Sequence, residues 1–307
     1  MNASTRIYDN TLAQLLKSRM DGERLRRLVE AKSVEDGLKM LADYGFSYSP
    51  DGSIDGFIVA ETNKLIEFVT ESESEKVAKS LLSEFVYNNV KLAYKSRFVE
   101  IGKEGYYEID GLDVDAVKHG DYKDCDDIMT AALDYLDSVG EKKPQNIDRV
   151  LTEAMYKTAL SCPSIVIKKY FRAQIDMTNI LTAARMFRLK INNEKEFISG
   201  GTIKIDELIE AASGNNFALV FSSTPYADMA DRLEKSDFSA LGAFEREADD
   251  YLFYMTDELA ASMSSFKPFL NRYTSARIEL KTIKAALVCI KTDSREAFYA
   301  RRPDIYA

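Results

Sequence analysis

Nucleophilic catalysis by a serine, cysteine or threonine normally needs a neighbouring base, and histidine is the base that enzymes use most often. The chain contains one histidine, His119. Gly120 follows it directly, and a glycine at this place is typical of a helix end, where an imidazole can face the last carbonyl groups or solvent. We therefore expect a structural role for His119, no catalytic residue, and a protein that is not an enzyme.

The segment 51–56, Asp-Gly-Ser-Ile-Asp-Gly, is the best candidate for a metal site. It fits positions one, three, five and six of a calcium-binding loop, and Ile58 supplies the apolar eighth position. The twelfth position is Thr62, where such a loop needs a glutamate that binds the ion with both oxygens. We therefore expect an ordinary turn. An enzyme with a metal bound at Asp51 to Asp55 is kept as an alternative.

A second acidic cluster comprises Asp121, Asp124, Asp126 and Asp127. No register of this cluster has a glycine at the sixth position of a calcium loop. Asp126 or Asp127 suits the start of a helix, because a carboxylate is stabilised at the positive end of the helix dipole. A helix start is therefore the expected reading of this cluster.

Zinc and phosphate sites lack their usual residue patterns. The three cysteines, Cys125, Cys162 and Cys289, lie far apart and are odd in number. This predicts reduced thiols in a cytosolic protein, with neither a disulfide framework nor a zinc site. Neither a phosphate-binding loop nor a dinucleotide-binding turn occurs in the sequence. We expect no metal and no cofactor.

An apolar, helix-like pattern between residues 170 and 188 is interrupted by polar side chains, and a glycine pair follows it. These residues are Asp176, Asn179, Arg185, Gly200 and Gly201. Their spacing puts Asp176 and Asn179 on one helix face, so that with Arg185 they could form a binding triad. We favour a hydrogen-bond and charge network that joins neighbouring helices. The glycine pair is expected to end a helix.

Fainter copies of this pattern occur upstream and downstream. The upstream copy contains Asn89 and Lys91, and the downstream copy contains Glu279 and Lys281. Asn89, Asn179 and Glu279 hold equivalent places, 90 and 100 residues apart. This spacing suggests one supersecondary unit used three times, which favours a scaffold over an enzyme. We expect structural roles for the residues of all three copies.

Helix-like spacing of apolar residues extends over most of the chain, so the predicted fold class is all-α. Short helices are expected from Asp113 to Gly120 and over 205–212, closed by Gly214. The one segment that could form a short strand is 106–109. A β protein of this size would instead show regular alternation and turns at about every 10 residues.

Charge and hydropathy exclude two classes of partner. The 307 residues carry a formal charge of -9, which argues against nucleic acid and against docking directly on an anionic membrane. No window approaches the roughly 20 apolar residues that cross a bilayer, and the N-terminus does not resemble a signal peptide. The local clusters of positive charge are expected to be solvated helix faces or, alternatively, contact patches. They comprise Arg24, Arg26, Arg27, Arg295, Arg301 and Arg302.

The order and spacing of the three motif copies resemble the C subunit of archaeal and bacterial A/V-type rotary ATPases, called subunit d in eukaryotic vacuolar ATPases. The likeness extends over nearly the whole chain. The residues that carry it are Asn89-x-Lys91, Asp176-x-x-Asn179 through Arg185 to the segment 197–203, and Ala276-x-x-Glu279-x-Lys281-x-x-Lys284.

The resemblance implies three related helical-bundle units arranged as a funnel. We expect the first unit over 1–120, closed in part by the C-terminal helix, the second over 121–214 and the third over 215–307. It also implies a single-copy, non-catalytic subunit of the central stalk in a proton- or sodium-transporting complex. Its partners would be the shaft subunits of the soluble motor and the membrane rotor ring, which would hold it at the cytoplasmic face. The alternative is a free-standing helical repeat adaptor that binds soluble proteins.

Overall fold

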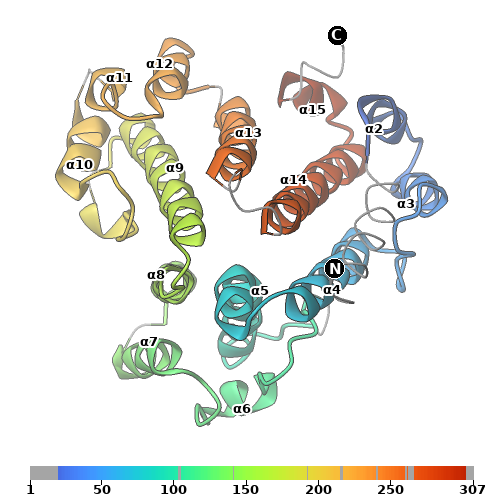
Figure 1. Cartoon of the computed structure of the whole chain (residues 1–307), viewed down its shortest axis with the longest axis horizontal. Coiled ribbons are helices and arrows are strands. Elements are labelled where there is room, and N and C mark those ends of the chain that lie inside the picture. The colour runs from blue at the N-terminus through green and yellow to red at the C-terminus, as the bar shows by residue number, and fades with distance from the viewer. Residues whose placement is uncertain are drawn as a thin grey trace. The chain divides into compact units, whose positions relative to one another are not determined.

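The computed structural model describes residues 20–102, 105–140, 142–191, 193–214, 217–239, 241–259, 261 and 266–301. These residues form helices joined by short connections, with no strand among them (Figure 1). The prediction of an all-α fold is confirmed.

The short strand expected over 106–109 is wrong, because this segment is irregular. The backbone N–H of Glu108 donates to the side-chain oxygen of Asn63, at 3.0 Å. A strand needs a second strand for its ladder of hydrogen bonds, and the described residues provide none. A side chain therefore supplies the backbone bond.

The described residues fall into two compact units. The first is drawn from 1–74, 102–108 and 256–307, and the second from 75–101 and 109–255. The first unit contains α2 (Gly22–Val29), α3 (Val34–Asp43), α4 (Ile54–Ser72), α14 (Phe266–Lys291) and α15 (Arg295–Arg301).

The second unit contains α5 (Glu75–Lys95), α6 (Val114–His119), α7 (Asp127–Ser138), α8 (Pro144–Leu160), α9 (Ile165–Leu189), the 3-10 helix η1 (Glu194–Glu196), α10 (Ile205–Ser213), α11 (Phe217–Val220) and α12 (Ala227–Lys235). Helix α13 (Leu241–Leu259) contains the boundary between the units. The expected division into three units over 1–120, 121–214 and 215–307 stays a prediction.

Six of the described α-helices start at a residue whose side chain accepts a hydrogen bond from the first helical turn, which satisfies a backbone N–H that the helix itself leaves unpaired. These capping residues are Asp21, Ser33, Ser53, Asp113, Asp126 and Ser164. Helix α6 ends as expected at Gly120, which has a φ of +83°. Helix α10 ends one residue later than expected, and Gly214 follows it.

In the first unit, α14 packs against α2, α3 and α4. Gly37 lets α3 lie close to α14 and α2. A Cβ at this position would lie 3.1 Å from the Leu287 side chain and 3.2 Å from the Leu28 side chain. Leu28, Leu41, Phe57 and Leu287 are fully buried in the resulting core. Figure 1 shows α14 and α15 beside α2 and α3.

Helix α15 is fastened to the end of α2. The Arg295 guanidinium donates to the carbonyl oxygens of Val29, at 3.0 Å, and Ala31, at 2.9 Å. The Tyr299 hydroxyl donates to the Glu30 carboxylate at 2.5 Å. The prediction that Arg295 lies on a solvated helix face is therefore wrong, because its guanidinium binds carbonyl groups at the C-terminal end of a helix. The side chains of Arg301 and Arg302 lie outside the described residues.

In the second unit, α5 packs against α8, α8 against α9, and α9 against α10. Helix α9 is buried on more than one face, with Ile167, Ile175, Ile180 and Ala183 fully covered. Figure 1 shows α10, α11 and α12 grouped beside α9. None of the helices in the described part of the chain is both long enough and apolar enough to span a bilayer.

Candidate functional site

Asp176 lies at the centre of a buried cluster on α9. Its Oδ1 accepts the backbone N–H groups of Thr202, at 2.7 Å, and Ile203, at 3.1 Å. Its Oδ2 accepts the hydroxyl of Thr202 and, at 3.1 Å, that of Tyr226. The side chain is fully buried, so these four donors replace the water that an ionised carboxylate needs.

Tyr226 stays a proton donor in this cluster. Burial and the negative charge of Asp176 both raise its pKa above the usual range for tyrosine. The phenol therefore keeps its proton at neutral pH. The hydroxyl can therefore donate a hydrogen bond to the Asp176 carboxylate while it keeps its own proton.

Asn179 lies almost one turn after Asp176 and binds the same loop. Its side-chain nitrogen donates to the Ile198 carbonyl oxygen at 2.8 Å, and its side-chain oxygen accepts the Ile198 N–H at 2.9 Å. The amide thus pairs with both backbone groups of one residue, as a second peptide group would. The two polar residues together hold the segment 198–203 against α9.

The Gly200-Gly201 pair lies within this loop, between η1 and α10, and so does not end a helix. The expectation of a helix end is wrong, and the reason is close packing. A Cβ on Gly201 would lie 2.2 Å from Oδ1 of Asp176, and a Cβ on Gly200 would lie 2.7 Å from the Leu160 side chain. Gly200 also has a φ of +104°, which side chains with a Cβ rarely adopt.

Arg185 is separate from this cluster. Its side chain is 53% exposed and lies 3.5 Å from the carboxylate of Glu245 on α13. The structure thus brings Asp176 and Asn179 together with the glycine pair. It gives Arg185 a surface ion pair instead.

The two fainter motif copies also lie on long helices, α5 and α14. Asn89 is buried on α5, and the Lys91 amine donates to the Thr152 hydroxyl at 2.7 Å. Burial lowers the pKa of Lys91. On α14, the Glu279 carboxylate accepts the Met20 N–H at 2.5 Å, just before α2, while Lys281 is exposed. Asn179 and Glu279 therefore both accept a backbone N–H from outside their own helix.

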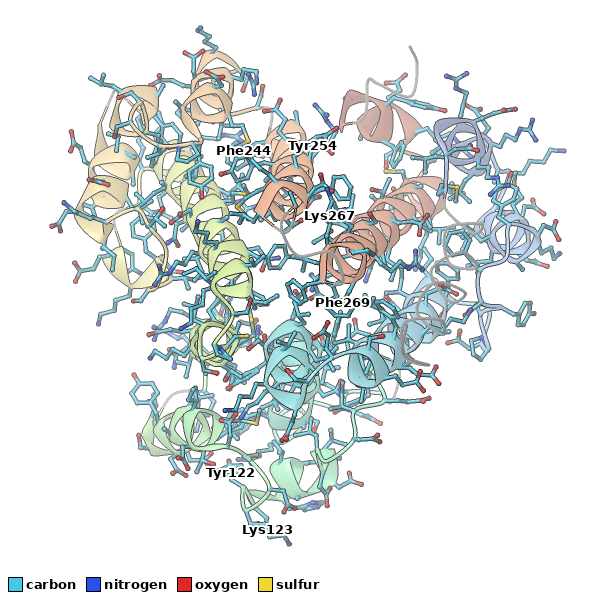
Figure 2. All side chains as sticks on the ribbon, viewed as in Figure 1. Tyr122, Lys123, Phe244, Tyr254, Lys267 and Phe269 are labelled. Atoms are coloured by element: carbon cyan, nitrogen blue, oxygen red, sulfur yellow. The ribbon has the colours of Figure 1, made fainter. Side chains whose placement is uncertain are left out.

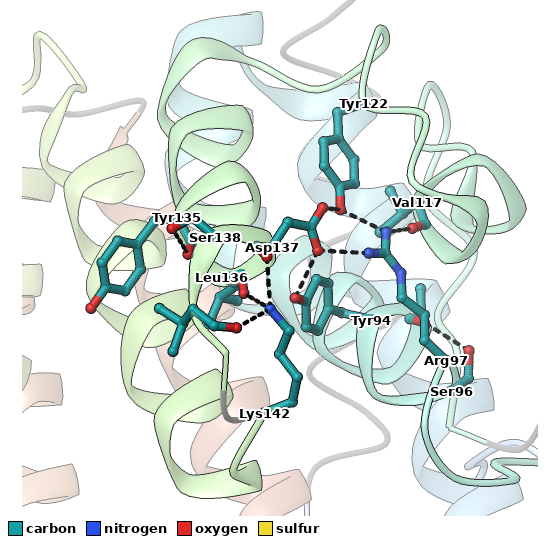
Figure 3. Close-up of polar contacts among 12 residues, drawn as sticks. Tyr94, Ser96, Arg97, Val117, Tyr122, Tyr135, Leu136, Asp137, Ser138 and Lys142 are labelled. Atoms are coloured by element: carbon teal, nitrogen blue, oxygen red, sulfur yellow. Dashed lines mark hydrogen bonds and ion pairs between the residues drawn. The ribbon is translucent and has the colours of Figure 1, made fainter.

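A second polar cluster, which the sequence did not reveal, surrounds Asp137 at the end of α7 (Figure 3). The Asp137 carboxylate accepts the hydroxyls of Tyr94, at 2.9 Å, and Tyr122, at 2.6 Å, and lies 3.0 Å from the Arg97 guanidinium. Arg97 also donates to the Val117 carbonyl oxygen and to the Tyr122 hydroxyl. One arginine and one aspartate thus join α5, α6 and α7.

The charges of this cluster are fixed at neutral pH. Partial burial opposes ionisation of Asp137, but hydrogen bonds from Tyr122 and Tyr94 and the charge of Arg97 lower its pKa. Burial and the Asp137 carboxylate raise the pKa of Tyr122 to about 12. Neither group can exchange a proton near pH 7, which fits a joint between helices and not an acid–base pair.

Lys142 completes the joint at the end of α7. Its amine donates to the carbonyl oxygens of Leu136, Asp137 and Val139 (Figure 3). These carbonyl groups have no further helical N–H to accept, so a cation there is stabilising.

His119 lies in the last turn of α6, where its Nδ1 is 2.7 Å from the Asp115 carbonyl oxygen. The ring therefore faces a carbonyl group of its own helix, as expected for a helix end. It is exposed to solvent.

The segment 51–56 forms a turn and the start of α4. The Asp51 carboxylate accepts the backbone N–H of Ser53, at 2.9 Å, and its hydroxyl, at 2.9 Å. The Ser53 hydroxyl caps α4, which already contains Asp55 and Gly56. Asp55 pairs with Lys284 at 3.2 Å. Asp51 and Asp55 thus bind different partners, Ser53 and Lys284.

In the second acidic cluster, Asp126 caps α7 by accepting the Met129 N–H at 2.8 Å, and it pairs with Lys79 at 3.0 Å. The expected helix start is confirmed. Across the part of the chain that the structure describes, no group of three or more histidine, cysteine, aspartate or glutamate side chains could hold a metal ion.

A comparison with family models matches the chain to a known family. The family described as ATP synthase (C/AC39) subunit matches residues 10–301. This range includes all three motif copies, from Asn89 to Lys281. No curated protein matches the chain.

Proposed function

Because the chain belongs to the ATP synthase (C/AC39) subunit family, a family of rotary ATPase subunits, we propose that it is a non-catalytic subunit of the central stalk. In this role it is a socket that receives the rotating shaft of the soluble motor on one face. Its other face rests on the membrane rotor ring. Rotation of the shaft thereby becomes rotation of the ring, which carries protons or sodium ions across the membrane.

The extent of the family match carries this proposal, because the match over 10–301 includes all three motif copies. The two polar clusters support it. Asp176 and Asn179 hold a loop to α9, and Asp137 with Arg97 joins three helices. Close-packed helices with such joints deform little, and a part that transmits torque must resist deformation. We propose that the motif residues contribute this stiffness.

We propose single-copy assembly with the shaft and ring subunits, without nucleic acid, a cofactor or a membrane span of its own. The chain would lie at the cytoplasmic face of the membrane through its contact with the ring. The net charge of -9 fits docking to protein subunits through complementary charge more readily than docking to anionic lipid.

The test is copurification of the tagged full chain from gently solubilised native membranes. Shaft and ring subunits should be recovered together with the chain. Mixing the purified chain with purified shaft subunits should give a complex on gel filtration, without ATP hydrolysis by the chain alone. Recovery of the chain free of any ATPase subunit would contradict the proposal and favour a helical repeat adaptor for soluble proteins.

A further inference from the structure

A cavity of about 740 Å³ lies in the second unit, where α9, α10 and α12 end. It is lined by the segments 187–188, 190–191, 212–213 and 237–239. Its volume is in the range of cavities that bind ligands or large side chains. The motif residues discussed above do not line it.

Three lining residues have the left-handed backbone conformation, which residues with a Cβ rarely adopt. Lys190, Asp237 and Phe238 have φ values of 54°, 50° and 54°. Lys190 follows the last residue of α9, a place where glycine is the usual residue. Strained residues that gather at one cavity are a feature of binding sites. A lysine at this helix end therefore suggests a use for its side chain.

The cavity has a positive surplus. Arg188 and Lys190 contribute two positive charges and Asp237 one negative charge, in a chain whose net charge is -9. The Arg188 guanidinium donates to the Phe238 carbonyl oxygen at 3.3 Å, which orients it at the cavity wall. A guanidinium has five N–H donors and matches a carboxylate in shape. The cavity thus favours an anionic group.

An exposed apolar side chain lies beside the two cations. Ile191 lines the cavity and is 49% exposed. A small inorganic anion would pair with Arg188 and Lys190 but would leave this side chain in water. A peptide with a carboxylate beside a large apolar residue would cover it as well.

We propose that this cavity is a docking site for a segment of a partner polypeptide that presents carboxylates next to a large apolar side chain. The carboxylates pair with Arg188 and Lys190, and the apolar side chain packs on Ile191. The site is independent of the proposed coupling role, because its evidence comes from the cavity alone.

The test measures fluorescence anisotropy of two labelled peptides, Gly-Asp-Leu-Phe-Glu-Gly and Gly-Lys-Leu-Phe-Lys-Gly, with the full chain at up to about 1 mM, since short peptides bind weakly. Only the acidic peptide should bind, and its binding should weaken at higher salt. Arg188→Gln should weaken binding by about fivefold or more, since one charge-assisted contact is lost. The matched control is Lys169→Gln, which removes an exposed cation near the other end of α9 and should leave binding unchanged.

Lys190→Gly separates binding from folding. Glycine suits the left-handed conformation, so the urea midpoint of unfolding should rise while binding of the acidic peptide weakens by about threefold or more. Equal binding of both peptides, or no binding to the unaltered chain, overturns the proposal. So does binding of inorganic phosphate at this site without binding of the acidic peptide, because that result would identify a small-anion site.

Discussion

At the scale of single residues, the positions of the central motif, which lie close together in the sequence, differ strongly in burial. Asp176 is fully buried with four donors around its carboxylate, whereas Arg185 is 53% exposed with one ion pair. A buried polar group that loses its partner costs much more than a surface ion pair. The same motif therefore contains residues of very different importance for stability.

Asp176→Ala should reduce the free energy of unfolding by at least about 3 kcal/mol, because it leaves the N–H groups of Thr202 and Ile203 and the Tyr226 hydroxyl without an acceptor. Arg185→Ala should change it by less than about 1 kcal/mol, as expected for an exposed pair. Urea unfolding followed by circular dichroism measures both. Equal losses for the two variants would show that burial does not govern their contributions.

Asp137 should make stability depend on acid pH. Its folded-state pKa is lowered, so the ionised group contributes stability above its unfolded-state pKa of about 4, and this contribution is lost as the pH falls through the folded-state pKa. Asp137→Asn should therefore be less stable than the unaltered chain at pH 7. The difference should shrink between about pH 4 and pH 2.

Urea midpoints at a series of pH values measure this difference. The control is Asp134→Asn, an exposed position on the same helix. It should follow the unaltered chain at every pH. A gap between Asp137→Asn and the unaltered chain that stays constant down to pH 2 would rule out an ionised Asp137 as its source.

At the scale of elements, the loop 198–203 depends on how closely α9 approaches it. Gly201→Ala should destabilise the protein by about 2 kcal/mol or more, because the added methyl group would lie 2.2 Å from the Asp176 carboxylate. Gly140→Ala is the matched control. A Cβ there meets nothing within 4 Å, so it should be neutral or slightly stabilising. Equal effects in thermal melts would exclude close packing as the reason for Gly201.

The helices were predictable from sequence wherever the signal was local. Asp113 and Gly120 bound α6 because a capping carboxylate and a left-handed glycine act within one turn of the helix. The Gly200-Gly201 pair was misread because the neighbour that requires it, Asp176, lies on another element. Glycine has several structural uses, and the sequence does not show which neighbour is close.

The Asp137 cluster could not be predicted for a related reason. Tyr94, Arg97 and Tyr122 lie 43, 40 and 15 residues from Asp137, and no spacing rule connects them. Only packing of α5, α6 and α7 brings them together. The buried place of Asn89 and the role of Glu279 at the start of α2 likewise depend on tertiary structure.

At the scale of the whole molecule, the chain is a set of packed helices whose exposed surface includes large side chains on several elements. Tyr254 on α13 is 70% exposed, whereas Phe244 on the same helix and Phe269 on α14 are buried (Figure 2). Tyrosine at an exposed place suits a contact with another protein, because the ring is rigid and its hydroxyl stays hydrated. This fits the proposed place in a larger assembly.

The two compact units should also unfold separately, because each has its own buried core. Leu287 in the first unit and Leu208 in the second are both fully buried, so they form a matched pair. Each change to alanine should cost about 2 to 5 kcal/mol. Urea unfolding should show two transitions, with Leu287→Ala shifting one and Leu208→Ala the other.

Hydrogen exchange read by mass spectrometry assigns each transition to its helices, since peptides from α14 and α10 report on different units. A single transition that both variants shift equally would mean that the units are thermodynamically one body. The proposed socket needs each unit to be stiff. Separate transitions would place that stiffness within the units, in the joints at Asp176 and Asp137 for the second and at Arg295 for the first.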